Sequence, residues 1–335
     1  MPTLFILEQG VKISKTSRRL ILEKNREILL DLPEFKVDKI FIFGNAQIST
    51  QAFKFMLETG KDVSFFTVRG RFMGKLVSHL SRNVFVRLKQ YECFKNERLR
   101  LEFCKKTIKA KLKNCRSVLQ RNARVYKDLD MEEEISRLEE LIASIEKRTG
   151  ISSLLGVEGM GSRIYFKGYA KLFKPEGFSF EARIKHPPLG FVNSMLSLGY
   201  ALITSEMFSV LFALGMDPYV GFLHALEYSR PSLALDLIEE LRPALIDRFI
   251  LEIVNKKVIK PGDFEESVFA ENGGNKRCLL SSQGRRVYFY HYERRMQTKV
   301  FYAEEEVNYR SLLEKKARNF IEFLKGENLM PFLIR

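Results

Sequence analysis

The hydrophobic pattern of the chain changes near residue 86, and this change constrains the fold more than any other feature. Before it, short runs of branched and aromatic residues are separated by glycine and proline, which is typical of β-strands and turns. After it, apolar residues recur at helical spacing. A chain of 335 residues is also long for a single hydrophobic core. The sequence therefore predicts an α+β protein, with a small N-terminal β-sheet or β-sandwich domain over residues 1–85 and a larger all-α C-terminal domain over residues 86–335.

The charge of the chain favours a polyanionic partner. Its 56 Lys and Arg residues exceed its 41 Asp and Glu residues, which gives a formal net charge of +15. Nucleic acid is the first expectation, because neutralised phosphates release counterions. An anionic membrane is the second, and a basic protein without such a partner is the remaining alternative.

The basic residues are densest in the first long helical segment. Residues 91–127 hold twelve Lys or Arg against three Glu, and an acidic segment follows that could pair with them as an antiparallel helical hairpin. Binding to a DNA backbone and a self-neutralised hairpin therefore both stay open. The spacing of Cys93, Cys104 and Cys115 predicts that they line the buried seam between these two helices.

Several signals indicate a cytoplasmic protein with no membrane partner. The four cysteines form no close CxxC pair, so neither a zinc ribbon nor a disulfide framework is predicted. The first eight residues lack the features of a signal peptide. The most apolar stretch, residues 196–216, carries polar residues that favour a buried core or subunit-interface helix over a membrane span.

The segment 219–243 brings one histidine and several carboxylates close to the start of a helix. The sequence Arg-Pro-Ser at 230–232 predicts that start, because proline is tolerated in the first helical turn. His224 lies in the approach, and Asp236 and Glu239 share one helical face. Pro243 removes the bond to the carbonyl of Glu239, which predicts a bend beside that carboxylate. One imidazole and one or two carboxylates form an incomplete metal shell, so the chain either supplies further ligands from elsewhere or leaves positions to water and substrate.

A further carboxylate stands out in the helix expected over residues 152–173. Glu158 is surrounded by Gly156, Gly159 and Gly161, each of which costs a helix about 1 kcal/mol relative to alanine. That cost indicates close approach by another backbone or a ligand. Tyr165 and Ser162 share the face of Glu158, and Arg163 is adjacent. In a later apolar helix, a polar stripe forms either a buried network or a surface toward metal and DNA; it consists of Asn193, Ser197, Tyr200 and Thr204.

Taken in order, four motifs resemble one known family. They are LLGVEGMGSRIYF, NSMLSLGYALI, GMDPYVGFLH and RPSLALDLIEELRP. In this order and spacing they are similar to the CRISPR-associated spacer-acquisition integrase, the first of the two adaptation proteins. The N-terminal segments IFIFGNAQIS and RGRFMGKL agree, so the resemblance covers essentially the whole chain.

The resemblance implies a metal-dependent DNA endonuclease and integrase. It assigns one Mg²⁺ or Mn²⁺ ion to Glu158, His224 and Glu239, although many relatives have aspartate in place of Glu239. Asp236 matches another acidic position, and either shares the metal or acts in its outer shell. Residue types alone do not exclude zinc. Second-rank expectations for orienting phosphates or substrate are Tyr165, Arg163, Asn193, Tyr200 and Arg230.

The implied reaction joins 3′-hydroxyl ends of captured DNA into the CRISPR repeat by phosphodiester strand transfer. The implied partners are double-stranded or branched DNA (protospacer and repeat), a second copy of the chain joined largely through the β domains, and the second, smaller adaptation protein. Two alternatives stay open. A stand-alone nuclease would release cut DNA, and a non-catalytic basic scaffold would only bind it.

Overall fold

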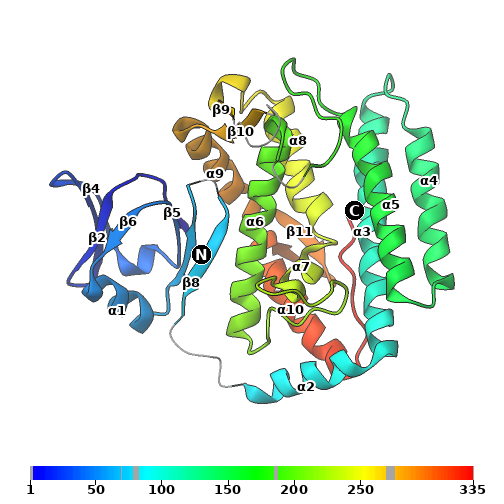
Figure 1. Cartoon of the computed structure of the whole chain (residues 1–335), viewed down its shortest axis with the longest axis horizontal. Helices are drawn as coiled ribbons and strands as arrows, with labels where there is room; N and C mark the ends of the chain where they lie inside the picture. The colour runs from blue at the N-terminus through cyan, green and yellow to red at the C-terminus, as the bar shows by residue number, and fades with distance from the viewer. Residues whose placement is uncertain (1–2, 69, 78–82, 185–187, 269–275, 335) are drawn as a thin grey trace. The chain divides into compact units, whose positions relative to one another are not determined.

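The structure is a computed structural model and describes residues 3–68, 70–77, 83–184, 188–268 and 276–334. The chain divides into two compact units, residues 1–80 and residues 81–335, so the division falls a few residues before the change in hydrophobic pattern. Strands make up most of the first unit and helices most of the second (Figure 1). The predicted α+β class is confirmed.

The first unit contains two four-stranded sheets. One has the order β1-β5-β7-β8, and the other has the order β4-β3-β2-β6. Helix α1 (Thr50–Glu58) follows β6 and starts at Ser49, whose hydroxyl accepts a hydrogen bond from the Ala52 amide at 3.2 Å. The strands are β1 (Thr3–Ile6), β2 (Val11–Thr16), β3 (Arg19–Lys24), β4 (Glu27–Pro33), β5 (Lys39–Phe43), β6 (Ala46–Ile48), β7 (Asp62–Phe66) and β8 (Phe72–Leu76).

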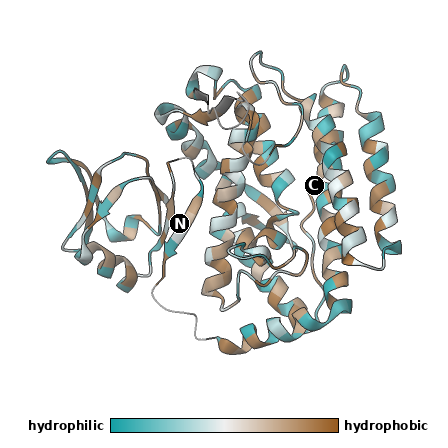
Figure 2. Cartoon of the chain, viewed as in Figure 1, coloured by the Kyte–Doolittle hydropathy of each residue, from teal (hydrophilic) through white to brown (hydrophobic). Residues whose placement is uncertain are grey.

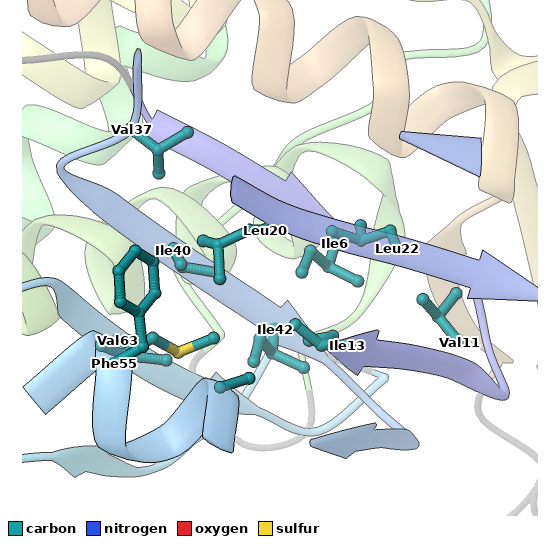
Figure 3. Close-up of a cluster of buried hydrophobic side chains, with 12 residues drawn as sticks. Ile6, Val11, Ile13, Leu20, Leu22, Val37, Ile40, Ile42, Phe55 and Val63 are labelled. Carbon is teal, nitrogen blue, oxygen red and sulfur yellow. The ribbon is translucent and has the colours of Figure 1, made fainter. Parts of the chain in front are cut away.

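The core of this unit lies between the two sheets. Ile40 and Ile42 of β5 meet Ile13 of β2 and Leu20 of β3, and Phe55 of α1 closes one side of the cluster (Figure 3). In β2, residues 11–13 are alternately buried, exposed and buried, as expected for a strand with one face against a core. The two sheets therefore form the β-sandwich that the sequence predicts.

The second unit is mostly helical. Its longest helix, α3, has 29 residues and contains neither glycine nor proline, and the Asn96 side chain caps it by accepting from the Leu99 amide. The α-helices are α2 (Val84–Lys95), α3 (Glu97–Val125), α4 (Glu132–Ser144), α5 (Ile151–Ala170), α6 (Gly190–Ala213), α7 (Ser232–Ile238), α8 (Arg248–Asn255), α9 (Ser282–Met296) and α10 (Tyr309–Leu324).

This unit is not all-α, which corrects the sequence prediction. Strands β9 (Phe264–Val268) and β10 (Lys276–Leu280) pair antiparallel, as do β11 (Lys299–Tyr302) and β12 (Glu305–Asn308). Strands of four or five residues in isolated pairs carry little periodic signal. The predicted closing helix from about residue 304 consequently starts only at Tyr309, after β12.

Helix α6 lies inside the second unit. It is long and apolar enough to cross a membrane, as its hydropathy shows (Figure 2). Half of its most apolar 18-residue window is buried within the protein. Its Glu206 is fully buried, pairs with Arg310 at 3.0 Å and accepts a hydrogen bond from Tyr292. Because a buried carboxylate requires such partners, α6 is best explained as a core helix.

The basic helix α3 does pair with the acidic segment that follows it. Arg116 contacts Glu139 of α4 at 2.7 Å, and Lys109 contacts Glu146 just beyond α4 at 2.6 Å. The cysteines of this region are buried, but they do not line the α3–α4 seam, which corrects that prediction. The thiols of Cys93 and Cys104 donate to the carbonyls of Leu324 and Phe222, and Cys115 lines the cavity described below.

Candidate active site

Asp236 organises the loop that carries the predicted histidine. It lies on α7, is fully buried, and its Oδ2 accepts hydrogen bonds from the amides of Phe222 at 2.6 Å and Leu223 at 2.9 Å. Its Oδ1 accepts from the amide of His224 at 3.1 Å. Helix α7 begins at Ser232, as the Arg-Pro-Ser sequence predicts. The carboxylate thus fixes the loop against the first turns of this helix.

The same carboxylate orients the imidazole of His224. Its Oδ1 lies 2.6 Å from His224 Nδ1, and a carboxylate can only accept, so Nδ1 carries the proton. In the neutral form of this imidazole, the other ring nitrogen, Nε2, has a lone pair, and it lies 3.9 Å from Glu239 Oε1. A carboxylate behind one ring nitrogen is a frequent arrangement for a histidine that binds metal through the other.

Glu239 lies where the helix is interrupted. Helix α7 ends at Ile238, and after a turn the chain continues as a π-helical turn, η3 (Pro243–Asp247). Proline lacks the amide that would bond to the carbonyl of Glu239, and the regular α-helix is interrupted at this point. The Glu239 side chain is buried and contacts Arg242 Nη1 at 3.0 Å. Burial opposes its ionisation, but Arg242 and then Lys111 outweigh burial and lower its pKa to about 2.

Glu158 comes from α5, and a glycine brings α5 close to α3. A Cβ added at Gly161 would lie 2.5 Å from Leu112 Cδ2, so a larger residue there would push the helices apart. At Gly156 and Gly159, by contrast, an added Cβ would meet nothing within 4 Å. The close approach that the glycines predict is therefore made at Gly161, and Gly159 lines the cavity.

This close approach places Lys111 of α3 between the two glutamates. Its ammonium contacts Glu158 Oε1 and lies 2.6 Å from Glu239 Oε2, and its side chain is 10% exposed. Burial lowers the pKa of Lys111, but Glu239 and Glu158 outweigh burial and raise it. For Glu158, burial alone would raise the pKa, but the positive charge of Lys111 outweighs burial, and the pKa of Glu158 is lowered. All three side chains are therefore charged at neutral pH.

These side chains open onto one cavity of about 580 Å³ in the second unit. Its wall is rich in basic groups, which suit it for phosphate binding. Arg163 is exposed there and, among the described residues, makes no hydrogen bond or ion pair, whereas Lys167 contacts Glu133 at 2.9 Å. The ionisable Lys, Arg, His, Asp and Glu residues of the wall are Lys111, Glu158, Arg163, Lys167, Glu181, Arg183, His224, Glu239, Arg242 and Asp247.

Two predicted tyrosines meet at a buried carboxylate in the same wall. Tyr165 and Tyr200 donate hydrogen bonds to Asp247, at 2.9 Å and 2.5 Å. Burial raises the pKa of Asp247 to about 6, although both tyrosine hydroxyls work against the shift. The guanidinium of Arg242 lies 4.9 Å from the centre of the Tyr200 ring, and that of Arg183 lies 5.5 Å from it.

The remaining predicted residues lie outside the cavity wall. Asn193 is buried and accepts from Arg183 at 3.0 Å, so it holds a residue of the wall without lining it. Arg230 pairs with Glu227 at 2.8 Å. Four residues of the wall are not among the predicted ones, namely Lys111, Arg183, Arg242 and Asp247. Only Arg242 had a usable signal, because it follows Glu239 by one helical turn.

The donor set fits a hard divalent cation, but it is not arranged as a metal cluster. Among the described residues, no three His, Cys, Asp or Glu side chains are close enough to hold an ion as they stand. The ammonium of Lys111 lies between Glu158 and Glu239. Both glutamates nevertheless contact this ammonium, and Nε2 of His224 lies 3.9 Å from Glu239 Oε1. Both oxygens of Asp236 already accept hydrogen bonds from the loop at residues 222–224.

Comparison with known proteins gives one consistent family. Residues 4–294 match the model of the family described as CRISPR associated protein Cas1. "CRISPR-associated endonuclease Cas1 3" of Thermus thermophilus is 31% identical over 337 residues, which cover 99% of this chain and 97% of that protein. A Cas4/Cas1 fusion of Geobacter sulfurreducens is 32% identical over 338 residues, and the chain spans 58% of its length.

Solved structures share the fold. A casposase bound to integration product superposes with a TM-score of 0.85 at 22% identity, over 98% of this chain and 92% of that one. A CAS1 protein from Thermotoga maritima gives 0.82 at 23% identity, over 98% of both chains. A Cas6-RT-Cas1–Cas2 complex gives 0.83 at 23% identity, over 99% of this chain and 36% of that one. The chain therefore belongs to the Cas1 family of CRISPR-associated endonucleases, the integrase family that its sequence motifs resemble.

Proposed function

We propose that this chain joins 3′-hydroxyl ends of captured DNA into a CRISPR repeat by strand transfer, using one Mg²⁺ or Mn²⁺ ion held by Glu158, Glu239 and His224. The observation that carries the proposal is that these three side chains line one basic cavity, where both glutamates contact Lys111 and His224 Nε2 lies 3.9 Å from Glu239. Oxygen donors with one imidazole suit these cations, and open positions remain for a phosphodiester. When bound, such an ion polarises a phosphoryl oxygen and stabilises the charge that develops on it.

The residues around this position have separate roles in the proposal. Asp236 acts behind His224, where it keeps the proton on Nδ1 and leaves Nε2 free. Arg163, exposed at the cavity, contacts a DNA phosphate and so positions the backbone for in-line attack. Tyr165 and Tyr200 hold Asp247 in the wall and shape the cavity.

The proposed substrate is double-stranded or branched DNA, as protospacer and repeat. The net charge of +15 supports a polyanionic partner, and the casposase of similar fold is bound to an integration product. The proposed protein partners are a second copy of the chain, joined through residues 1–80, and the smaller adaptation protein, since a neighbour of similar fold is part of a Cas1–Cas2 complex. The proposed location is the cytoplasm, where the DNA is.

A strand-transfer assay tests this proposal. The protein and its small partner are incubated with Mn²⁺, a short duplex with 3′-hydroxyl ends and a plasmid that carries the repeat. Glu158→Ala and His224→Ala should abolish the joined product. Glu227→Ala is the control, because this exposed carboxylate pairs with Arg230 outside the cavity. Cut DNA without joining would instead indicate a nuclease, and equal DNA binding without either reaction would indicate a scaffold.

A further inference from the structure

Lys111 occupies an unusual place for a lysine. It belongs to the basic stretch of α3, yet it is buried, and its ammonium ends between two carboxylates of the proposed metal site. Other lysines of the same helix point elsewhere, such as Lys109, which pairs with Glu146. Lys111 is therefore part of the site and not of the surface charge of α3.

The charges of this group balance without a metal. Glu158 and Glu239 supply two negative charges, and Lys111 with Arg242, 3.0 Å from Glu239, supply two positive charges. A divalent cation would bind the same carboxylate oxygens that Lys111 contacts. In a buried site, two cations at one position repel strongly. The ammonium and the metal therefore cannot both lie between Glu158 and Glu239.

The surroundings determine which part of Lys111 can move. The α3 backbone is held by the contact between Leu112 and Gly161, so α3 cannot retreat from α5 without opening their packing. The four-carbon stem of lysine is flexible, and its ammonium can turn toward another anion in the cavity. A DNA phosphate is the anion that the proposed function brings there.

We propose that Lys111 is an internal counter-ion that competes with the metal for Glu158 and Glu239, and that an incoming DNA phosphate takes over its ammonium and so favours metal binding. This inference rests on the function proposed above. Its consequence is a positive coupling between metal and DNA. By thermodynamic linkage, DNA raises the affinity for the metal by the same factor as the metal raises the affinity for DNA.

Manganese binding tests this inference without an activity readout. Free Mn²⁺ is measured by electron paramagnetic resonance during titration of the full chain, with and without a short DNA duplex. Without DNA, Lys111→Met should bind Mn²⁺ about tenfold or more tightly than the wild type, because the competing charge is gone. DNA should tighten Mn²⁺ binding by the wild type, and this effect should shrink in Lys111→Met.

Two further variants separate the outcomes. Lys113→Met removes a charge from the same helix outside the cavity wall and should behave as the wild type. Glu239→Gln shows which Mn²⁺ binding belongs to the site. Binding that depends on Glu239 but is equally strong in wild type and Lys111→Met would overturn the inference and leave the proposed function intact. No Mn²⁺ binding in either protein would overturn both.

Lys111→Arg covers the case in which Lys111→Met fails to fold. Arginine keeps the charge and binds carboxylates through a planar fork. Without DNA, the Lys111→Arg protein should therefore bind Mn²⁺ no more tightly than the wild type does. Tighter binding by Lys111→Arg would show that charge at this position does not compete with the metal, which would overturn the inference.

Discussion

Asp236→Asn is the substitution that most directly tests how His224 is prepared for metal binding. The change keeps the size of the side chain and replaces one acceptor oxygen with a donor NH₂ group. In the wild type, Oδ2 accepts from the amides of Phe222 and Leu223, and Oδ1 accepts from the amide and Nδ1 of His224. Four donors therefore face two oxygens, and an asparagine cannot satisfy all of them in either orientation.

The two orientations of the asparagine fail in different ways. If its NH₂ takes the place of Oδ2, it faces two buried amides, and two unsatisfied donors cost about 2 to 6 kcal/mol of unfolding free energy. If the NH₂ takes the place of Oδ1, it donates to His224 Nδ1 and moves the ring proton to Nε2. In that tautomer Nε2 has no lone pair for a metal, so the affinity of the protein for Mn²⁺ should fall about 10- to 100-fold.

Two assays on Asp236→Asn distinguish these effects, namely urea unfolding without metal and Mn²⁺ titration of the folded protein. The control is Asp217→Asn, in the same loop region, where the carboxylate accepts from the Tyr219 amide and Tyr91 hydroxyl. It should lose stability and keep its metal affinity. A folded Asp236→Asn protein with wild-type stability and wild-type Mn²⁺ affinity would refute the orientation of His224 by Asp236.

Three other predictions concern packing, pH and DNA. Gly161→Ala should destabilise the protein by about 1 to 3 kcal/mol, because the new methyl group would overlap Leu112. Gly156→Ala should instead stabilise the protein by up to about 1 kcal/mol, because a methyl group there meets open space. Equal urea midpoints for the two variants would contradict the close α3–α5 contact. Burial raises the pKa of Asp247 from 3.8 to about 6, so the folded protein holds a proton that the unfolded chain releases, and stability is lost as pH rises through this range. As pH rises from about 4 to about 6, the free energy of unfolding of Asp247→Asn should therefore increase relative to that of the wild type. Parallel curves of unfolding free energy against pH for the two proteins would exclude the raised pKa of Asp247. Arg163→Ala should weaken DNA binding and reduce the slope of the logarithm of the binding constant against the logarithm of salt concentration by about 1, the value of one phosphate contact. An unchanged slope would place Arg163 away from the DNA.

The sequence was most informative where the site depends on local structure. The helix start at Ser232 and the interruption after Ile238 follow from the two prolines, which act on neighbouring residues only. The glycines around Glu158 likewise indicated a close approach, although only Gly161 makes one. The short hairpins of the second unit were missed because strands of this length have no clear period.

Residues that reach the site through tertiary packing could not be predicted in this way. Lys111 is one of twelve basic residues between 91 and 127, and nothing in its immediate sequence sets it apart from Lys109 or Lys113. Its role follows from the side of α3 that faces α5, which depends on helix packing over a long separation in sequence. Asn193 shows the reverse case. Its place in a polar stripe suggested that it lines the cavity, but its side chain does not line the wall and instead accepts a hydrogen bond from Arg183, which does.

The pairing of buried charges also determines how the protein responds to metal removal. A site made only of carboxylates would repel itself when empty, and proteins built on such sites unfold with chelators. Here Lys111 and Arg242 compensate Glu158 and Glu239 within the chain. Chelation should therefore abolish strand transfer and leave the circular dichroism spectrum unchanged, and added Mn²⁺ should restore activity. In Lys111→Met, half of that compensation is lost, so the same chelator should lower the melting temperature more than in wild type. An equal response of both proteins would show that Lys111 does not stabilise the metal-free site.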